Sequence, residues 1–506
     1  MAKSVVLTEM PIWFDRYYSI RSSIQTLVEA CELESKFPDN FDVLELALYR
    51  AANTDCVMED NLKRIENGRF GFLYRLGLFK HALYLKYQFL KPKLESYPSF
   101  RKSYANAQII DRLNNAEELY VASLPNYANF LVKNVWMRSA SRTKLLVAPQ
   151  AICTELVKRF QIRTNDCIHL EELLAIANME NGGQNPEVSI SYKKRSHAVR
   201  AVMQYRRINY AAALRGLLLR YFSSFDWQCN LVNFLHENLV LANQTSIIVA
   251  RDRRHLENIF LQVLRYKGAK TKMYPHGMLS SNFEITHLFT SNYKFIDEVW
   301  CWGPQQEDVI RLRQNTLGEH LPAFKRFNEP LKALPKQKNA IRNGIIFVGE
   351  GINDAEIFHL ANKVADLNMR EEYQLIFRPL KALKFKSNAT RSGMLIVDQK
   401  PNFFDRYSGH GLIVVGASST LVLETMVDGA LGLLLKDSYF AHKKPGFYFF
   451  EANRKSVASC EDGFFFGDQK SLISKICELT GDQASKKIAD AKAKQEKLIE
   501  YFICQQ

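Results

Sequence analysis

Short runs with a strand-like pattern alternate with amphipathic segments along most of this chain. The first set of runs occupies residues 119–123, 144–148, 245–250, 271–274 and 298–302. Between several of them, apolar residues recur every three or four positions, which is the period of a helix with one buried face. Strands that alternate with helices in this way predict a parallel sheet.

The alternation restarts after a stretch rich in proline and positive charge. Residues 322–343 include Pro330 and Pro335, with five Lys or Arg between Lys325 and Lys338, and this composition predicts a linker. Beyond it, five further strands are predicted at residues 344–348, 373–377, 394–397, 412–415 and 431–435. The chain is therefore predicted to be an α/β protein with two Rossmann-like domains.

The remaining regions are predicted to be helical. Residues 1–115 show helical periodicity with little strand signal, and a long helical insert is predicted at 195–243. The predicted organisation is a helical N-terminal region (1–115), a first Rossmann-like domain (116–325), a second (340–480) and a C-terminal amphipathic helix (484–506).

The composition is typical of a folded protein with several domains. A chain of 506 residues is too long for one core, and 47% hydrophobic and 24% charged residues are ordinary values. The N-terminus lacks a signal-peptide pattern, and no run of ~18 apolar residues occurs. The nine cysteines are scattered without the spacing of a zinc site. We therefore expect a cytoplasmic protein with reduced thiols and no metal site.

The net charge of +15 is concentrated in one region. Residues 193–272 contain 15 Lys and Arg against four acidic residues. Such a patch attracts anionic lipid at the inner face of the plasma membrane or an acidic glycan, although a solvated basic surface without a partner is the simpler alternative. No nucleic-acid-binding motif accompanies it, so nucleic acid is not an expected partner.

In the first predicted sheet, two strands end in residues suited to proton transfer. Asp252 follows residues 245–250, and His276 with Gly277 follows residues 271–274. The carboxyl ends of parallel strands lie at one edge of a sheet, so a carboxylate and an imidazole are expected to share a site there. The alternatives are that Asp252 caps a helix or forms a local ion pair, and that His276 is a turn residue.

In the second predicted sheet, the segment 411–435 predicts a strand, a tight turn, a helix and a strand. The turn contains Ser418, Ser419 and Thr420, whose hydroxyls and backbone N–H groups at a helix N-terminus suit a phosphate. Glu424 lies one turn inside the helix, where it could accept hydrogen bonds from a sugar. The alternative is that Ser418 only caps the helix.

Two earlier strand ends of the same sheet carry further candidates. Residues 344–348 are followed by Gly349, Glu350 and Gly351. Glycines at this position would let a nucleotide approach the backbone closely. A plain tight turn is an equally good explanation. Arg378 and Lys381 follow residues 373–377 and could bind phosphate. Surface charge is the alternative for these two cations.

The order of these motifs resembles the GT-B glycosyltransferases of bacterial capsule and lipopolysaccharide synthesis. Within that group, the chain is most similar to enzymes that use CMP-activated 2-keto acid sugars, such as sialic-acid-like nonulosonates or Kdo. The resemblance covers under half of the chain, and bacterial sialyltransferases usually have His-Pro where this chain has Arg378-Pro379. It is carried by Asp252, Pro275-His276-Gly277, residues 297–303, Arg378-Pro379, Ser418-Ser419-Thr420 and Glu424.

The resemblance implies a GT-B architecture, with two Rossmann-like domains facing across a cleft. The nucleotide-sugar donor would bind the C-terminal domain and a glycan or glycolipid acceptor the N-terminal domain. Ser418, Ser419 and Thr420 would hold the phosphate, and Glu424 the ribose or base. His276 or Asp252 would be the base, with Glu284 in reserve. No Asp-x-Asp motif ends a strand, so transfer without metal or additional cofactor is expected.

Three alternatives remain at this point. A UDP-N-acetylglucosamine 2-epimerase-like enzyme shares the architecture and a Ser-rich turn, but it would need several carboxylates near the strand ends. A teichoic-acid-type polyol-phosphate transferase, which uses a CDP donor, also fits Pro275-His276-Gly277. A non-catalytic scaffold of a polysaccharide assembly complex is the third.

Overall fold

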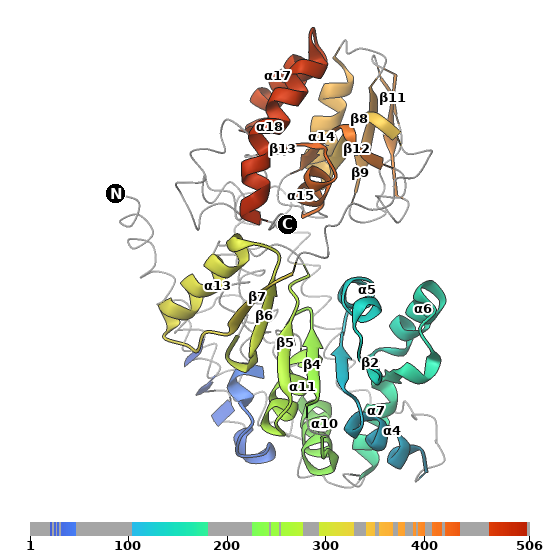
Figure 1. Cartoon of the computed structure of the whole chain (residues 1–506), viewed down its shortest axis with the longest axis vertical. Coiled ribbons are helices and arrows are strands. Elements are labelled where there is room, and N and C mark those ends of the chain that lie inside the picture. The colour runs from blue at the N-terminus through green and yellow to red at the C-terminus, as the bar shows by residue number, and fades with distance from the viewer. Residues whose placement is uncertain are drawn as a thin grey trace, which may run out of the picture. The chain divides into compact units, whose positions relative to one another are not determined.

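The computed structural model forms two compact units (Figure 1). The first contains Met1–His276, Phe283–Trp300 and Gln314–Lys325, and the second contains Gly277–Asn282, Cys301–Arg313 and Arg326–Gln506. The structure describes residues 21–22, 25–26, 28–29, 32–46, 104–180, 225–241, 244–251, 255–276, 293–327, 341–349, 354–367, 373–379, 388–390, 393–399, 407–416, 420–435 and 465–502.

A seven-stranded sheet organises the first unit, with strand order β3-β2-β1-β4-β5-β6-β7. The neighbouring pairs from β3 to β6 are parallel. The strand order reverses between β1 and β4, which makes this the topological switch point of a doubly wound fold. The strands are β1 (Glu118–Val121), β2 (Lys144–Ala148), β3 (Cys167–His169), β4 (Ser246–Val249), β5 (Lys270–Met273), β6 (Glu298–Cys301) and β7 (Ala323–Arg326).

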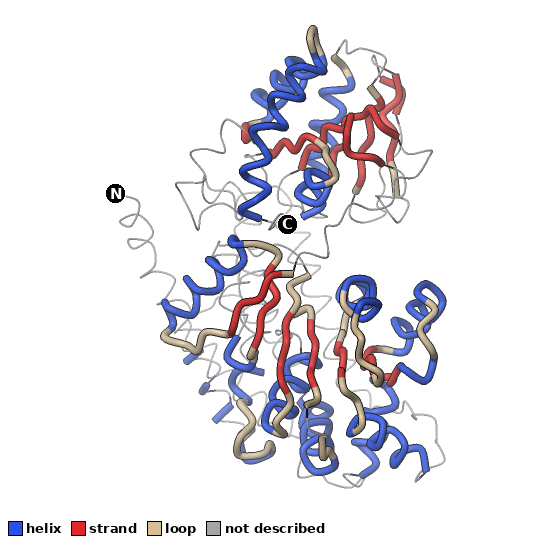
Figure 2. The backbone as a smooth tube through the Cα atoms, viewed as in Figure 1, coloured by secondary structure: helices blue, strands red, loops and turns tan. Residues whose placement is uncertain are grey.

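Helices surround these strands (Figure 2). They are α4 (Tyr104–Asn114), α5 (Pro125–Asn134), α6 (Gln150–Phe160), α7 (Leu170–Glu180), α10 (Phe225–Asn238) and α11 (His255–Tyr266), with short 3-10 helices η1 (Glu34–Lys36), η2 (Trp136–Arg138), η3 (Thr164–Asp166) and η5 (Tyr293–Phe295). Helix α13 (Pro304–Leu317) is divided between the units, with its residues up to Arg313 in the second. Helix α11 is buried from Leu256 to Leu264. Burial of strand and helix apolar surface stabilises this unit.

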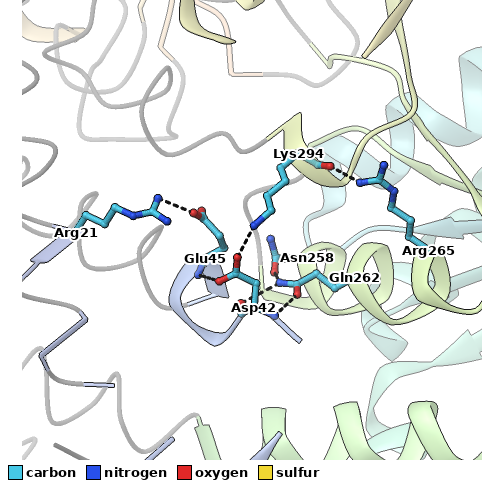
Figure 3. Close-up of polar contacts among 7 residues, drawn as sticks. All are labelled: Arg21, Asp42, Glu45, Asn258, Gln262, Arg265 and Lys294. Carbon is cyan, nitrogen blue, oxygen red and sulfur yellow. Dashed lines mark hydrogen bonds and ion pairs between the residues drawn. The ribbon is translucent and has the colours of Figure 1, made fainter. Parts of the chain in front are cut away.

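The N-terminal segment around Asp42 belongs to the first unit. Its backbone N–H donates to Gln262 Oε1 (2.7 Å), and its carboxylate accepts from Lys294 Nζ (2.8 Å) (Figure 3). Gln262 also donates to Asn258 within α11 (2.8 Å). Because Gln262 is buried, its hydrogen bonds are shielded from water and fix the segment on α11, whereas the Asp42–Lys294 contact is exposed. Most of the predicted helical region 1–115 lies outside the described residues.

A second seven-stranded sheet has the order β10-β11-β9-β8-β12-β13-β14. Its neighbouring pairs are parallel except β10 with β11. The order reverses between β8 and β12, which is the switch point of this sheet. The strands are β8 (Ile341–Val348), β9 (Gln374–Arg378), β10 (Asn388–Thr390), β11 (Gly393–Val397), β12 (Tyr407–Gly416), β13 (Leu431–Leu435) and β14 (Phe465–Gly467).

The helices of the second unit complete one core with these strands. They are α14 (Asp354–Ala365), α15 (Thr420–Val427), α17 (Gln469–Thr480) and α18 (Ala484–Phe502). Apolar residues of β8, β9, β12 and β13 cluster with Leu360, Leu472 and Ile488. The C-terminal helix α18 therefore contributes to the core of the second unit.

Gln495 joins α18 to β13 by two hydrogen bonds. Its amide accepts from the Gly432 N–H (3.3 Å) and donates to the Gly432 carbonyl (2.9 Å). Strand β14 pairs with β13 only from Leu433 onward. The buried Gln495 side chain thus satisfies backbone groups that β14 does not reach.

We expect Gln495→Leu to lower the free energy of unfolding of the second unit by about 1–3 kcal/mol. The change leaves the buried Gly432 backbone groups without partners while keeping an apolar side chain. Urea unfolding followed by circular dichroism measures it, with Lys494→Gln as the control because Lys494 is exposed on the same helix. Equal stability of the two variants would contradict this role.

The predicted α/β class with two Rossmann-like units is confirmed by the two sheets. Strands β3, β10 and β14 were not predicted, since each has only three residues. The predicted linker at 322–343 is wrong at its start, where β7 lies, and at its end, where β8 begins at Ile341. Strand β7 ends the sheet and is largely exposed, so it has no apolar pattern to reveal it. Among the described residues, no helix is long and apolar enough to cross a membrane.

Candidate functional site

The first candidate site lies at the carboxyl ends of β1, β4 and β5, three neighbouring strands. Ser123 follows β1, Arg251 follows β4 and His276 follows β5. This edge includes the switch point between β1 and β4, where doubly wound sheets bind their ligands. Asp252, the predicted carboxylate partner of His276, and the reserve base Glu284 lie outside the described residues.

His276 is largely enclosed by aromatic rings of α5. Its imidazole makes edge contacts with Tyr127 (5.4 Å between centroids) and Phe130 (5.6 Å). Desolvation, followed by the positive charge of Arg251, lowers the pKa of His276 from 6.5 to about 4. His276 is therefore neutral at pH 7, and the same burial and Arg251 charge make it a weaker base than a free imidazole.

Arg251 lies beside this histidine on the same strand edge. Its guanidinium carbon is 5.5 Å from the centre of the Tyr127 ring, a cation–π contact that orients the side chain. Among the residues that the structure describes, Arg251 forms no ion pair. The site thus combines a cation, a neutral imidazole and an aromatic wall.

Glu257 supports the turn that follows β1. This fully buried carboxylate in the first turn of α11 accepts from the Ser123 backbone N–H and from Ser123 Oγ, both at 2.8 Å. The sequence interpretation missed Glu257, although its place in the first turn of a helix after a strand was a usable signal. The contact ties the turn before α5 to α11, and α5 carries the rings around His276.

The low pKa of His276 predicts a pH-dependent stability. The unfolded imidazole takes up a proton near pH 6.5, whereas the folded one stays neutral until about pH 4. The contribution to stability is therefore complete above pH 6.5 and is lost as pH falls toward 4. When the pH falls from 7 to 5, we expect the free energy of unfolding of wild type to decrease by about 2 kcal/mol more than that of His276→Gln.

Urea unfolding at the two pH values measures this difference. His320→Gln is the control, because His320 is exposed. Its free energy of unfolding should decrease between the two pH values by as much as that of wild type. An identical pH dependence in wild type and His276→Gln would show that the folded and unfolded imidazoles titrate alike.

The second candidate site lies at the switch point between β8 and β12. Gly349 follows β8, and a Cβ atom there would overlap the carboxylate of Asp354 at the start of α14. Gly416 ends β12, and a Cβ there would lie 2.6 Å from Val422 Cγ2 of α15. Both glycines therefore allow a helix to approach the strand closely. The predicted strand, turn, helix and strand of segment 411–435 are present as β12, α15 and β13.

Arg378 ends β9 and forms an ion pair within the second unit. Its guanidinium Nη1 lies 3.1 Å from Asp398 Oδ2, and the Tyr407 hydroxyl donates to the same oxygen (2.7 Å). The side chains of Arg378 and Asp398 are 19% and 5% exposed. Asp398 follows β11 and was missed because a single Asp after a strand has no motif. It fixes the orientation of the guanidinium at the strand end.

The structure brings together only part of the predicted donor site. Thr420 is the first residue of α15, and Glu424 lies one turn further along this helix and is partly exposed. Five other predicted residues lie outside the described part of the chain: Glu350, Gly351, Lys381, Ser418 and Ser419. Their roles, like that of Glu424, stay predictions.

Within the described residues, no group of three or more His, Cys, Asp and Glu side chains could hold a metal ion. Among the described cysteines, Cys153, Cys167, Cys229 and Cys301 are buried free thiols and Cys477 is an exposed one. Transfer without metal remains a prediction.

Comparison with known proteins gives only distant structural similarity. No family model and no curated protein matches the chain. A UDP-N-acetylglucosamine 2-epimerase has a TM-score of 0.42 at 10% identity, over 76% of this chain and 96% of its own. The calicheamicin glycosyltransferase CalG4 has a TM-score of 0.37 at 11% identity, over 76% and 95%. The glycotransferase of kitacinnamycin has 0.38 at 7%, over 76% and 99%. Because these TM-scores lie below 0.5, the similarities assign no activity to this chain.

Proposed function

We propose that this protein is a glycosyltransferase that moves a sugar from a nucleotide-activated donor to a glycan acceptor. The observation that carries the proposal is the presence of two Rossmann-like sheets in one chain, each with polar or glycine residues at its switch point. One sheet can then bind the nucleotide and the other the acceptor. The resemblance in motif order favours a CMP-activated 2-keto acid sugar as donor.

The second unit offers the features that a nucleotide phosphate requires. Transfer from CMP leaves an anionic phosphate, so dipoles and cations near it stabilise the charge that develops. The close approach at Gly416 places the start of α15 near the carboxyl edge of β12. Arg378 lies at the end of β9, where Asp398 orients its guanidinium and offsets its charge, so it would support phosphate binding through its remaining N–H groups. Ser418, Ser419 and Thr420 would bind the phosphate, with Lys381 supporting them and Glu424 on the ribose or base.

The first unit offers a proton acceptor. An acceptor hydroxyl must lose its proton as it attacks the sugar, and a neutral imidazole can take it. His276 lies at the strand edge of this unit and is neutral at pH 7, although the burial and the Arg251 charge that lower its pKa to about 4 also weaken it as a base. Asp252 and Glu284 are the alternative bases. The basic stretch 193–272 would attract an acidic acceptor or an anionic membrane surface.

A UDP-N-acetylglucosamine 2-epimerase-like activity is the second candidate. It is favoured by two buried carboxylates near strand ends of the second unit, Asp354 at the start of α14 and Asp398 after β11. Proton transfer at a sugar carbon needs such groups. Asp398, however, is already engaged by Arg378 and Tyr407.

Thermal unfolding of the full chain with CMP, CDP, UMP or UDP separates these activities. A ligand that binds only the folded state stabilises it by about 2.7 kcal/mol at one hundred times its dissociation constant. Stabilisation by CMP and not by UDP supports the proposal. Stabilisation by UDP alone favours the epimerase-like activity, and stabilisation by CDP alone favours the polyol-phosphate transferase. If none of the four nucleotides stabilises the protein, a non-catalytic scaffold is favoured.

A further inference from the structure

Arg251 lies at the carboxyl edge of the first sheet, where no carboxylate among the described residues forms an ion pair with it. It follows β4 at the switch point of the first sheet and forms no ion pair with any described residue. Other arginines of this unit do have acidic partners, such as Arg265 with Asp297 (3.1 Å). Glu257, the buried carboxylate of the same edge, is occupied by Ser123.

The surroundings of Arg251 hold the guanidinium in place. Tyr127, which is 5% exposed, lies under it at 5.5 Å, and the same ring contacts His276. A half-buried arginine fixed by an aromatic ring loses little entropy when it binds a planar oxyanion through two parallel hydrogen bonds. The positive charge is also unfavourable to a neighbouring imidazolium, as the direction of the His276 shift indicates, so an anion would relieve it.

We infer that Arg251, beside His276, binds the carboxylate or phosphate oxyanion of an acidic acceptor sugar. This inference rests on the proposed function, because it assigns the acceptor to the first unit. The acceptor hydroxyl then lies near the His276 imidazole, while the oxyanion neutralises Arg251. The net charge of +15 draws such an acceptor toward the protein.

Isothermal titration calorimetry of the full chain with monosaccharide probes tests this inference. The probes are glucuronate and glucose 6-phosphate, with neutral glucose for comparison. Wild type should bind at least one charged probe and bind glucose more weakly. Arg251→Gln should lower the affinity for the charged probe by about tenfold or more, because a charge-assisted hydrogen-bonded pair is lost. Lys158→Gln removes an exposed cation of the same unit and should leave its affinity within about twofold.

The two charged probes distinguish the source of the oxyanion. Binding of glucuronate alone points to an acidic sugar, and binding of glucose 6-phosphate alone points to a phosphorylated one. If Arg251→Gln and Lys158→Gln lose the same affinity for the charged probes, the inference is overturned. It is also overturned if neither charged probe binds wild type more tightly than glucose does.

CMP binding in the same three proteins separates this inference from the proposed function. CMP should bind all three alike, because its site is assigned to the second unit. If CMP binds but the charged probes do not depend on Arg251, only the inference fails. If the probes depend on Arg251 but CMP does not bind, the CMP-dependent function fails while the oxyanion site stands.

Discussion

His276→Gln is expected to lower the rate of sugar transfer by about 10²–10⁴-fold. Glutamine keeps a polar side chain at the end of β5 but cannot accept the hydroxyl proton. Nucleotide affinity should be unchanged, because the donor site is assigned to the other unit. The measurement is kcat/KM for release of CMP from a CMP-activated sugar, with CMP affinity determined by calorimetry on the same preparations.

The pH dependence of wild type gives a second test of this role. A base whose pKa is about 4 stays active well below pH 6, so kcat/KM should not fall near pH 6.5 as it would for an exposed histidine. His320→Gln, which alters an exposed histidine, should retain wild-type activity. If His276→Gln keeps full transferase activity, then His276 is not the base and the role belongs to Asp252 or Glu284.

Asp398→Ala is expected to lower the free energy of unfolding of the second unit by about 3–5 kcal/mol. The substitution removes the carboxylate that neutralises Arg378 and also the acceptor of the Tyr407 hydroxyl. Because Arg378 is 19% exposed, it would be left as a poorly solvated charge. Urea unfolding of the variant measures the loss.

An exposed ion pair of the same unit provides the control. Lys475 and Glu478 lie 3.0 Å apart on α17 with 27% and 49% exposure, so Glu478→Ala should cost less than about 1 kcal/mol. Replacing all three partners, in Arg378→Met with Asp398→Leu and Tyr407→Phe, should recover most of the loss, because no buried polar group of the pair is then left unpaired. If Asp398→Ala is no more destabilising than Glu478→Ala, the buried pair does not hold the end of β9.

The strands that form the interior of both sheets could be predicted because their apolar pattern reflects burial. The runs at 431–435 and 144–148 coincide with β13 and β2, whose residues are almost all buried. Strand β7 could not be found, since an exposed edge strand has no need of apolar residues. The hydrophobic period of a sequence shows which residues are buried. It does not reveal a strand that pairs with its neighbour while its side chains stay exposed.

The candidate sites could be located but not completed from the sequence. His276 and Gly349 follow predicted strands, so parallel topology placed them at sheet edges. Glu257 and Asp398 act through partners that lie far away in the sequence, Ser123 and Arg378. Gly349 was predicted to leave room for a nucleotide, yet the Asp354 carboxylate lies where its Cβ atom would be. Such contacts appear only after the chain has folded.

Release of CMP from a CMP-activated 2-keto acid sugar tests the proposed activity most directly. The full chain should release CMP faster when an acidic glycan acceptor is present, and the product should carry the transferred sugar. His276→Gln should abolish the stimulation while CMP remains bound. Absence of acceptor-stimulated release, together with inversion at C2 of UDP-N-acetylglucosamine, would contradict the proposal and identify an epimerase-like enzyme.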